Sequence, residues 1–513
     1  MHFLPLLTAT TTVLALDIFP RQASPQKLTV NPSQKFQTID GFGFSEAFQR
    51  AYNILGLEEA KRTKLIDLLF NTTTGAGFSI LRNGIGSSPN STKDWMNTIL
   101  PKGPASPKEK PEYVWDKNDT GQLWVSQQAV KYGVKTFYAN AWAAPGFMKT
   151  NGRDSHGGTL CGLPGTNCMT GDWRQAYADY LVQYIKFYHE SGVDVTHLGF
   201  VNEPDYARAY FPVAPCLHPW YDSTSHLSHL ITYPPTRCPI ATDLTFLRAP
   251  YASMTATGAQ AADFIRILHP TLRAANLSHV HITCCEATGW NVQANLTHDL
   301  RLEGVEHLLG VITSHPYTHD IDGSLPTTLP VWQTEYSDLV SGWSTAWYTT
   351  GRLGDGYTWA NKLHYALTSG NVTAYLWWLA TQDKETNNHN NEKLILVDKG
   401  EYYVSKRFWA FAQYSRTIRP GAVRIWIEGG NGLKTTAFVN ADGSTVVNVI
   451  NTQAEAVAFE VQGVKGTSAN AWVTDESNDM TAVGTTVGAD GSVGGINVPG
   501  RGLISLVIKP LAA

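Results

Sequence analysis

The chain has 513 residues, which is longer than one hydrophobic core usually extends, so we expect one large domain and one smaller domain. Its formal net charge is −4, and charged residues make up only 16% of the sequence. This composition excludes a basic stripe for nucleic acid and an acidic tail, so we expect no nucleic-acid partner.

Residues 1–23 are predicted to be a signal peptide and leader. An apolar stretch from Phe3 to Leu16 carries small residues, Val13 and Ala15, at positions typical of signal cleavage. No later segment has the length of a transmembrane helix, so we expect a secreted protein with no membrane partner. Six Asn-x-Ser/Thr sequons agree with a secreted glycoprotein. They begin at Asn71, Asn90, Asn118, Asn276, Asn295 and Asn371.

Residues 41–416 alternate short apolar runs with longer helical stretches, which is the pattern of β/α repeats. The fold class is therefore α/β, and we predict a (β/α)8 TIM barrel. The eight predicted strands are Gly41–Gly43, Phe78–Arg82, Val134–Ala139, His197–Val201, Val280–Cys284, Gly310–Thr313, Pro330–Gln333 and Ala374–Leu379. The helical stretches include Glu58–Phe70, Gly121–Tyr132, Trp173–Glu190, Gly258–Leu268 and Thr358–Ser369.

Residues 417–513 change to alternating strands with Gly, Asn and Asp turns, which indicates an antiparallel β-sandwich. Its predicted strands are Val423–Ile427, Leu433–Val439, Thr445–Ile450, Ala456–Val461, Ala471–Thr474 and Leu503–Ile508. Residues 24–40 also contain strand-like segments, and we expect them to join this sandwich. Its aromatic residues fall within predicted strands, so we interpret the domain as structural. They are Trp426, Phe438, Phe459 and Trp472.

The six cysteines fit an oxidising compartment, but six cysteines allow fifteen pairings. Two pairs enclose short loops and are the disulfides that we favour, Cys161 with Cys168 and Cys216 with Cys238. Cys284 and Cys285 are adjacent on a predicted strand, where neighbouring side chains face opposite ways. We therefore expect them to be buried thiols or to have unusual partners. No set of His or Cys residues has closed zinc spacing, so we expect no metal site.

Two glutamates follow predicted strands in matching positions. Glu203 lies in Asn202-Glu203-Pro204 on the fourth strand, and Glu335 follows the seventh. Catalytic groups of TIM barrels lie where strands end, and strands four and seven can face each other across the barrel mouth. Pro204 is expected to hold Glu203 extended. Two carboxyls at one site favour glycoside hydrolysis, in which one protonates the leaving oxygen and the other attacks or activates water.

Several segments spread over nearly the whole chain form a recognisable set. They are Gly41-Phe42-Gly43, Arg82, residues 140–149 (Asn-Ala-Trp-Ala-Ala-Pro-Gly-Phe-Met-Lys), Asn202-Glu203-Pro204, Ser314-His315-Pro316-Tyr317 and Trp332-Gln333-Thr334-Glu335. Together they resemble glycoside hydrolase family 30. Residues 43–50 (Gly-Phe-Ser-Glu-Ala-Phe-Gln-Arg) look more like the fungal subfamily 7 xylanases and glucuronoxylanases than like other branches.

This resemblance implies a retaining double displacement with Glu203 as acid/base and Glu335 as nucleophile, and it implies no cofactor. We expect Glu335 to stay ionised through hydrogen bonds and nearby positive charge. The predicted substrate-binding residues are Arg50, Arg82, Trp142, Asn202, His315, Tyr317 and Trp378.

Alternatives remain open for several of these residues. Arg82 can instead be a salt bridge between barrel loops, and His315 a core histidine. Trp142 and Trp378 can stack on a sugar or pack in the core. Glu286 ends the fifth predicted strand and competes with Glu203 for the acid/base role.

Arg50 carries a separate hypothesis. Its guanidinium can pair with the carboxylate of a glucuronate branch on xylan, which a lysine would not reproduce in bidentate form. The alternative is an arginine on a helix surface.

The function predicted from these observations is a secreted β-1,4-xylanase, endo- or exo-acting, that favours glucuronate-substituted xylan. We expect a monomer whose partner is this polysaccharide. A β-1,6-glucanase, or another retaining β-glycosidase of the same family, is the nearest alternative. A carbohydrate-binding protein without turnover is the alternative from a different class.

Overall fold

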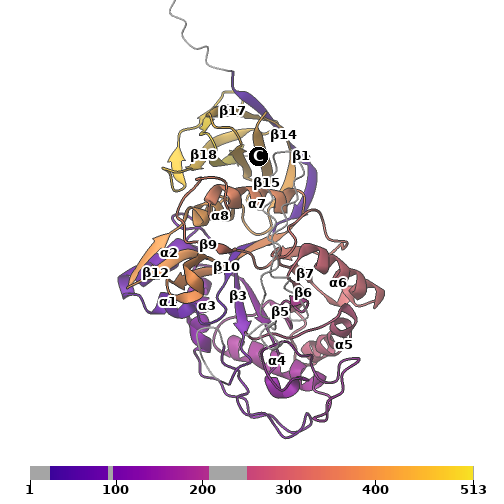
Figure 1. Ribbon diagram of the computed structural model, residues 1–513. Coiled ribbons are helices and arrows are strands. Elements are labelled where there is room, and N and C mark those ends of the chain that lie inside the picture. The colour runs from indigo at the N-terminus through magenta and orange to yellow at the C-terminus, as the bar shows by residue number, and fades with distance from the viewer. Residues whose placement is uncertain (1–23, 90–95, 207–250, 512–513) are drawn as a thin grey trace, which may run out of the picture.

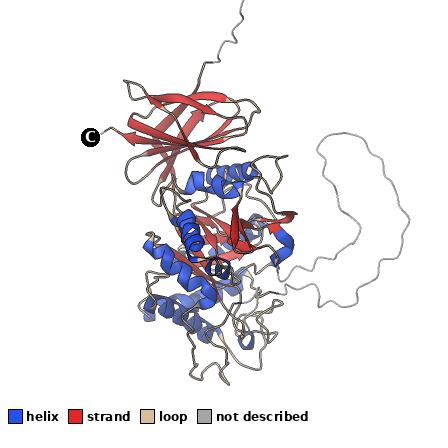
Figure 2. Cartoon of the chain, turned by 90° about the vertical axis from the view of Figure 1, so that its left-hand side faces the viewer, coloured by secondary structure: helices blue, strands red, loops and turns tan. Residues whose placement is uncertain are grey.

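The computed structural model describes residues 24–89, 96–206 and 251–511. These residues form a barrel of parallel strands wrapped by helices, with a β-sandwich packed against one side (Figure 1). Figure 2 shows the sandwich as a separate body of strands, with helices between it and the barrel. The predicted fold class is confirmed.

The barrel is closed by eight parallel strands, since β10 pairs with both β2 and β8. All eight predicted strands are present with shifted ends. They are β2 (Gly41–Ser45), β3 (Ile80–Ile85), β4 (Thr136–Ala141), β5 (His197–Gly199), β6 (His281–Ala287), β7 (Val311–Ser314), β8 (Val331–Gln333) and β10 (Ala374–Asp383). Two strands that were not predicted extend the sheet beyond β10, β12 (Lys393–Asp398) and β13 (Glu401–Val404). A separate two-stranded ribbon joins β9 (Asp338–Gly342) to β11 (Asn390–Asn391).

Helices follow the strands and bury one face each against the barrel, as β/α repeats require. They are α1 (Ala51–Leu55), α2 (Glu59–Phe70), α3 (Gln122–Lys131), α4 (Arg174–Glu190), α5 (Gly258–Ala274), α6 (Trp290–Leu302), α7 (Gly356–Thr368) and α8 (Lys406–Ser415). The start of α5 shows how locally these ends are encoded. Thr257 and Gln260 form a reciprocal capping box there, which satisfies two backbone donors.

The sandwich contains an N-terminal strand, as predicted. Strand β1 (Gln26–Thr38) pairs antiparallel with β14 and parallel with β17. The other strands are β14 (Val423–Gly429), β15 (Leu433–Val439), β16 (Thr445–Asn451), β17 (Val457–Gln462), β18 (Gly466–Thr474), β19 (Thr481–Val483), β20 (Thr486–Val487), β21 (Val493–Val498) and β22 (Leu503–Pro510). Of these, β19, β20 and β21 were not predicted.

The cysteine predictions have mixed outcomes. Cys161 and Cys168 form a disulfide, as expected, with 5.8 Å between their Cα atoms. Cys216 and Cys238 lie outside the described residues. Cys284 and Cys285 are disulfide-bonded to each other, so of the two alternatives the unusual partner is confirmed and the buried thiols are not. The peptide bond between them is cis.

Candidate active site

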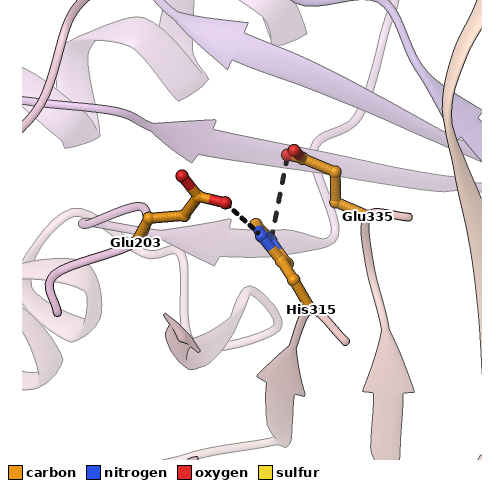
Figure 3. Close-up of side chains that lie close together, drawn as sticks. All are labelled: Glu203, His315 and Glu335. Carbon is orange, nitrogen blue, oxygen red and sulfur yellow. Dashed lines mark hydrogen bonds and ion pairs between the residues drawn. The ribbon is translucent and has the colours of Figure 1, made fainter. Parts of the chain in front are cut away.

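Glu203 and Glu335 meet at one end of the barrel. Glu203 follows β5, Glu335 follows β8, and their side chains are 12% and 7% exposed. One oxygen of each lies within 4.8 Å of the other and of a nitrogen of His315 (Figure 3). Retaining glycosidases keep their carboxyls about 5–5.5 Å apart and inverting ones about 6.5–9.5 Å apart. The spacing here is therefore on the retaining side.

The backbone of Glu203 is not extended, so that prediction was wrong. Its φ is +48°, and the φ of Glu286 is +60°. The N–H of Glu203 donates to the carbonyl of Glu286 at 2.9 Å, which ties the two loops together. This tertiary hydrogen bond outweighs the local preference that Pro204 imposes. Non-glycine residues in this region are uncommon and cluster at functional sites.

Arg82 lies inside β3 rather than at its tip, and its side chain is fully buried. Its Nη1 donates to Glu335 Oε2 at 2.7 Å, and its Nη2 donates to Glu286 Oε2 at 3.0 Å and to Asn202 Oδ1 at 2.7 Å. The guanidinium thus holds three predicted or competing site residues in fixed positions. It is an ion-pair residue, but its partners are the carboxylates of the site and not barrel loops.

His315 bridges the carboxylates. Its Nδ1 lies 3.1 Å from Glu203 Oε1, and its Nε2 lies 2.6 Å from Glu286 Oε2. Burial lowers its pKa, but Glu335, Glu203 and Glu286 outweigh that effect and raise the pKa to about 10. The ring is therefore an imidazolium that positions carboxylates. Because it is fully buried, the predicted sugar contact is not available to it.

The donor types of Glu203, His315 and Glu335 are also those of a metal site. A metal ion binds neutral imidazole. The carboxylates instead favour a proton on His315, so this cluster is better suited to holding a proton than a metal ion.

Glu286 is enclosed, with a side chain only 1% exposed. Tyr138 donates to its Oε1 at 2.5 Å and Thr334 to its Oε2 at 2.7 Å, in addition to the contacts with Arg82 and His315. Burial raises its pKa, but Arg82, His315 and the hydrogen bonds lower it to about 2. Both oxygens are occupied by protein groups. The alternative of Glu286 as acid/base therefore does not fit.

Neighbouring groups shift the pKa of Glu335 in opposite directions. Tyr317 donates to its Oε1 at 3.2 Å, and Arg82 binds its other oxygen. Burial raises the pKa of Glu335 and the nearby charge of Glu203 adds to the increase, although His315 and Arg82 lower it. The expected positive charges are present, but they do not fully offset burial.

Aromatic rings line the site beside the carboxylates. Trp142 follows β4, Trp378 lies in β10, and Phe48 joins them with ring centroids 5.4 Å and 5.8 Å away. Arg82 Cζ lies 4.5 Å from the Trp142 ring centroid. Trp142 and Trp378 are 2% and 7% exposed, so each packs tightly and leaves little of its ring surface free for a sugar. Phe48 was not predicted as a site residue, although it lies in the segment 43–50 that suggested the subfamily.

Tyr251 was missed by sequence reasoning. Its hydroxyl donates to Glu203 Oε2 at 3.0 Å, and its ring stacks parallel to Tyr206, with 6.4 Å between centroids. No motif surrounds Tyr251. Its contact with Glu203 spans 48 positions and arises only from tertiary packing.

Arg50 is buried, with 4% exposure, so the alternative of a helix-surface arginine was wrong. Its Nε donates to Gln382 Oε1 at 2.9 Å, and its Nη1 donates to the carbonyl of Phe48 at 2.6 Å. Gln382 belongs to β10, which places this guanidinium at the same end of the barrel as Trp378.

Comparisons with known proteins agree with this architecture. A sequence model described as O-glycosyl hydrolase family 30 matches residues 25–210, and one described as the family 30 glycosyl hydrolase beta sandwich domain matches residues 421–502. The chain is 37% identical to the catalytic domain of GH30 xylanase C from Talaromyces cellulolyticus, with a TM-score of 0.81, over 94% of this chain and 100% of that one.

Curated relatives are more distant. An endo-1,6-beta-D-glucanase of Neurospora crassa is 24% identical over 87% of this chain and 86% of its own length. The lysosomal acid glucosylceramidase of Mus musculus is 24% identical over 85% of this chain and 79% of its own length. The names of these three proteins indicate three different substrates. The chain described here belongs to glycoside hydrolase family 30.

Proposed function

We propose that this enzyme is secreted and cleaves β-1,4-xylosidic bonds of xylan with retention of configuration, with Glu335 as nucleophile and Glu203 as acid/base. The observation that carries the substrate is the 37% identity to a GH30 xylanase over 94% of the chain. The close approach of the two carboxylates supports the mechanism.

In the first step Glu335 attacks the anomeric carbon and forms a glycosyl ester. The bond to the leaving oxygen breaks, and Glu203 transfers its proton to that oxygen. Arg82 and Tyr317 orient Glu335 through the hydrogen bonds to its two oxygens. Tyr251 and His315 hold Glu203 in the same way.

In the second step Glu203, now a carboxylate, removes a proton from water. The water oxygen bonds to the anomeric carbon, and Glu335 departs as a carboxylate. Two inversions at one carbon give net retention.

The charges of the active-site side chains sum to −1 when all three carboxyls are ionised, so one additional proton neutralises the cluster. Glu203, Glu286 and Glu335 supply three negative charges when ionised, and Arg82 and His315 supply two positive charges. One further proton makes the cluster neutral. The proposed mechanism uses this proton as the one that the acid/base transfers to the leaving oxygen.

We further propose a preference for glucuronate-substituted xylan through Arg50. The hydrogen bonds to Gln382 and to the Phe48 carbonyl fix the direction of its guanidinium, which supports a role in oriented carboxylate recognition.

The curated relatives supply the second candidate, a β-1,6-glucanase, which would use the same carboxylates. Product analysis on glucuronoxylan, neutral arabinoxylan and β-1,6-glucan separates the two, with Glu335→Gln as the inactive control. Xylo-oligosaccharides released by the parent alone support the proposal. Release only from β-1,6-glucan overturns the substrate and keeps the mechanism, and absence of release from every polymer overturns both.

A further inference from the structure

Helices α7 and α8 of the barrel cover only part of the outer face of the sandwich. Strands β15 and β22 contact α7 and α8, and Phe438 and Leu503 are fully buried there as part of the barrel core. Along β14 the side chains alternate, and Ile425 points into the sandwich core. Of the outward side chains of β14, Trp426 and Glu428 are exposed and Arg424 is half-buried.

Three aromatic rings, those of Phe36, Tyr365 and Trp426, lie along the edge of this covered face, which we call the margin. Trp426 of β14 is 38% exposed, and Tyr365 of α7 is 47% exposed. Phe36 of β1 is half-buried, with its ring centroid 6.3 Å from that of Trp426 and the planes 26° apart. The interpretation of Trp426 as a packing residue is therefore wrong, whereas Phe438 is buried as expected. Exposed rings that gather in one place mark binding surfaces.

Two cations lie beside these rings. Arg424 Cζ lies 3.9 Å from the centroid of Phe36, and Lys434 Nζ lies 4.4 Å from the centroid of Tyr365. Burial, together with the charges of Lys434 and Arg424, lowers the pKa of His364 to about 4. Both cations lie beside α7, because Lys434 contacts Tyr365 and Asn361 of that helix, and Arg424 binds Gln37, which in turn binds Leu367.

The cations are held in place across the junction of the two domains. Gln37 accepts a hydrogen bond from Arg424 Nε at 2.7 Å and donates to the carbonyl of Leu367 in α7 at 2.6 Å. Lys434 Nζ donates to Asn361 Oδ1 at 2.6 Å. A surface organised in advance loses less conformational entropy when it binds a ligand.

The margin lies far from the cleft along the barrel axis. Gln37 also donates to the carbonyl of Val372, which precedes β10, whereas Glu335 follows the end of β8. Because parallel strands share one direction, these positions are at opposite ends of the barrel. A ligand on the margin therefore leaves the cleft open.

We propose that this margin, the junction strip, binds an acidic, uronate-bearing polysaccharide outside the catalytic cleft. The junction strip consists of Phe36, Tyr365, Arg424, Trp426 and Lys434. Ring faces match the C–H faces of sugars, and the two cations pair with carboxylates. The one acidic side chain of β14 is the exposed Glu428, two residues after Trp426 along the strand. This inference rests on the polysaccharide substrate proposed above. The strip holds the enzyme on one chain while the cleft cleaves another.

Affinity electrophoresis tests the strip in a Glu335→Gln background, so that turnover does not consume the probe. The gels contain glucuronoxylan, neutral arabinoxylan or no polysaccharide, with a short neutral xylo-oligosaccharide in excess to occupy the cleft. We expect Trp426→Ala and Tyr365→Ala each to weaken retardation by glucuronoxylan at least about twofold. Tyr403→Ala is the matched control, because Tyr403 is a 49% exposed aromatic on β13.

Lys434→Gln tests the charge separately, and it should weaken retardation by glucuronoxylan while leaving that by arabinoxylan unchanged. Retardation of the Trp426→Ala and Tyr365→Ala variants equal to that of their background overturns the strip. If Lys434→Gln weakens retardation by glucuronoxylan and by arabinoxylan equally, the preference of the strip for acidic polysaccharide is overturned. Thermal midpoints of the variants identify any that fail to fold. Product release by the active parent is a separate measurement, so failure of the xylanase proposal is distinguishable from failure of the strip.

Discussion

The two ends of the barrel interior place the same residue type in opposite charge states. At the cleft end, His315 contacts carboxylates, and its pKa rises to about 10 despite burial. At the other end, His197 lies against Trp332, with 4.3 Å between ring centroids. Burial, with a contribution from His281, lowers the pKa of His197 to about 3. One ring is a cation at neutral pH, and the other is neutral.

The surroundings of each histidine explain the difference. The end near His197 is closed by an apolar layer that includes Ile80, Val311 and Trp332, where an unpaired charge would be costly. At the cleft end, Arg82 and His315 lie beside the buried carboxylates of Glu286 and Glu335. Buried charge in this barrel is thus concentrated where it can position reacting groups, and the other end provides packing.

Replacing the proposed nucleophile should have the largest effect. Glu335→Gln keeps the shape of the side chain but removes the attacking carboxylate, so kcat should fall on the order of 10⁴-fold. Steady-state hydrolysis of glucuronoxylan measures the loss. Glu335→Ala with added azide should give a glycosyl azide of inverted configuration, because azide then replaces the carboxylate in a single displacement. A variant that still turns over like the parent would show that Glu335 is not the nucleophile.

Removing the cation at the cleft end should have the next largest effect. His315→Gln retains hydrogen bonding without the charge, and we expect kcat/KM to fall about 100-fold. His315 lowers the pKa of Glu335. Without it, the acidic limb of the pH profile should move to higher pH. His197→Gln is the matched control and should leave that limb in place, and an unmoved limb in both variants would contradict the assigned role of the imidazolium.

Arg50→Lys should have a smaller and selective effect. Lysine keeps the charge but loses the planar pair of donors, so the ratio of activity on glucuronoxylan to that on neutral arabinoxylan should fall about tenfold. Initial rates on the two polymers give this ratio. An equal decrease on both would assign Arg50 to the support of the turn at Phe48 instead.

The smallest effect should appear in stability at the other end of the barrel. The folded pKa of His197 lies near 3, below its unfolded value of about 6.5. Below pH 6.5 the unfolded chain binds a proton that the folded protein does not, so stability should decrease as pH falls toward 3. His197→Gln should flatten that decrease.

Thermal midpoints of the parent and of His197→Gln, measured between pH 3 and pH 6.5, test this pH dependence of stability. His315 has the opposite sign, because its raised pKa makes its contribution disappear as pH rises from about 6.5 toward 10. Identical pH dependence of the parent and His197→Gln would contradict the assignment of His197 as a buried neutral ring.

Much of the fold could be predicted because its patterns are local. Strand β15 coincides with its predicted bounds, and α2 and α4 begin one residue later than expected, since apolar periodicity and turn residues mark such elements. Strands β12 and β13 were missed because they extend the barrel sheet where no β/α repeat predicts a strand. The partners of Cys284 and Cys285 were left open, because a regular strand would turn neighbouring side chains to opposite faces.

The sequence by itself determined the family, the order of the elements and the two glutamates, because each is carried by a short motif or a periodic pattern. Only the tertiary structure decided which residues hold those glutamates. Tyr251, Glu286 and Phe48 reach the site through contacts between distant segments, and burial next to carboxylates makes His315 a cation. The charge state of a side chain and its distance from other site residues depend on its neighbours in space, and short sequence patterns do not specify those neighbours.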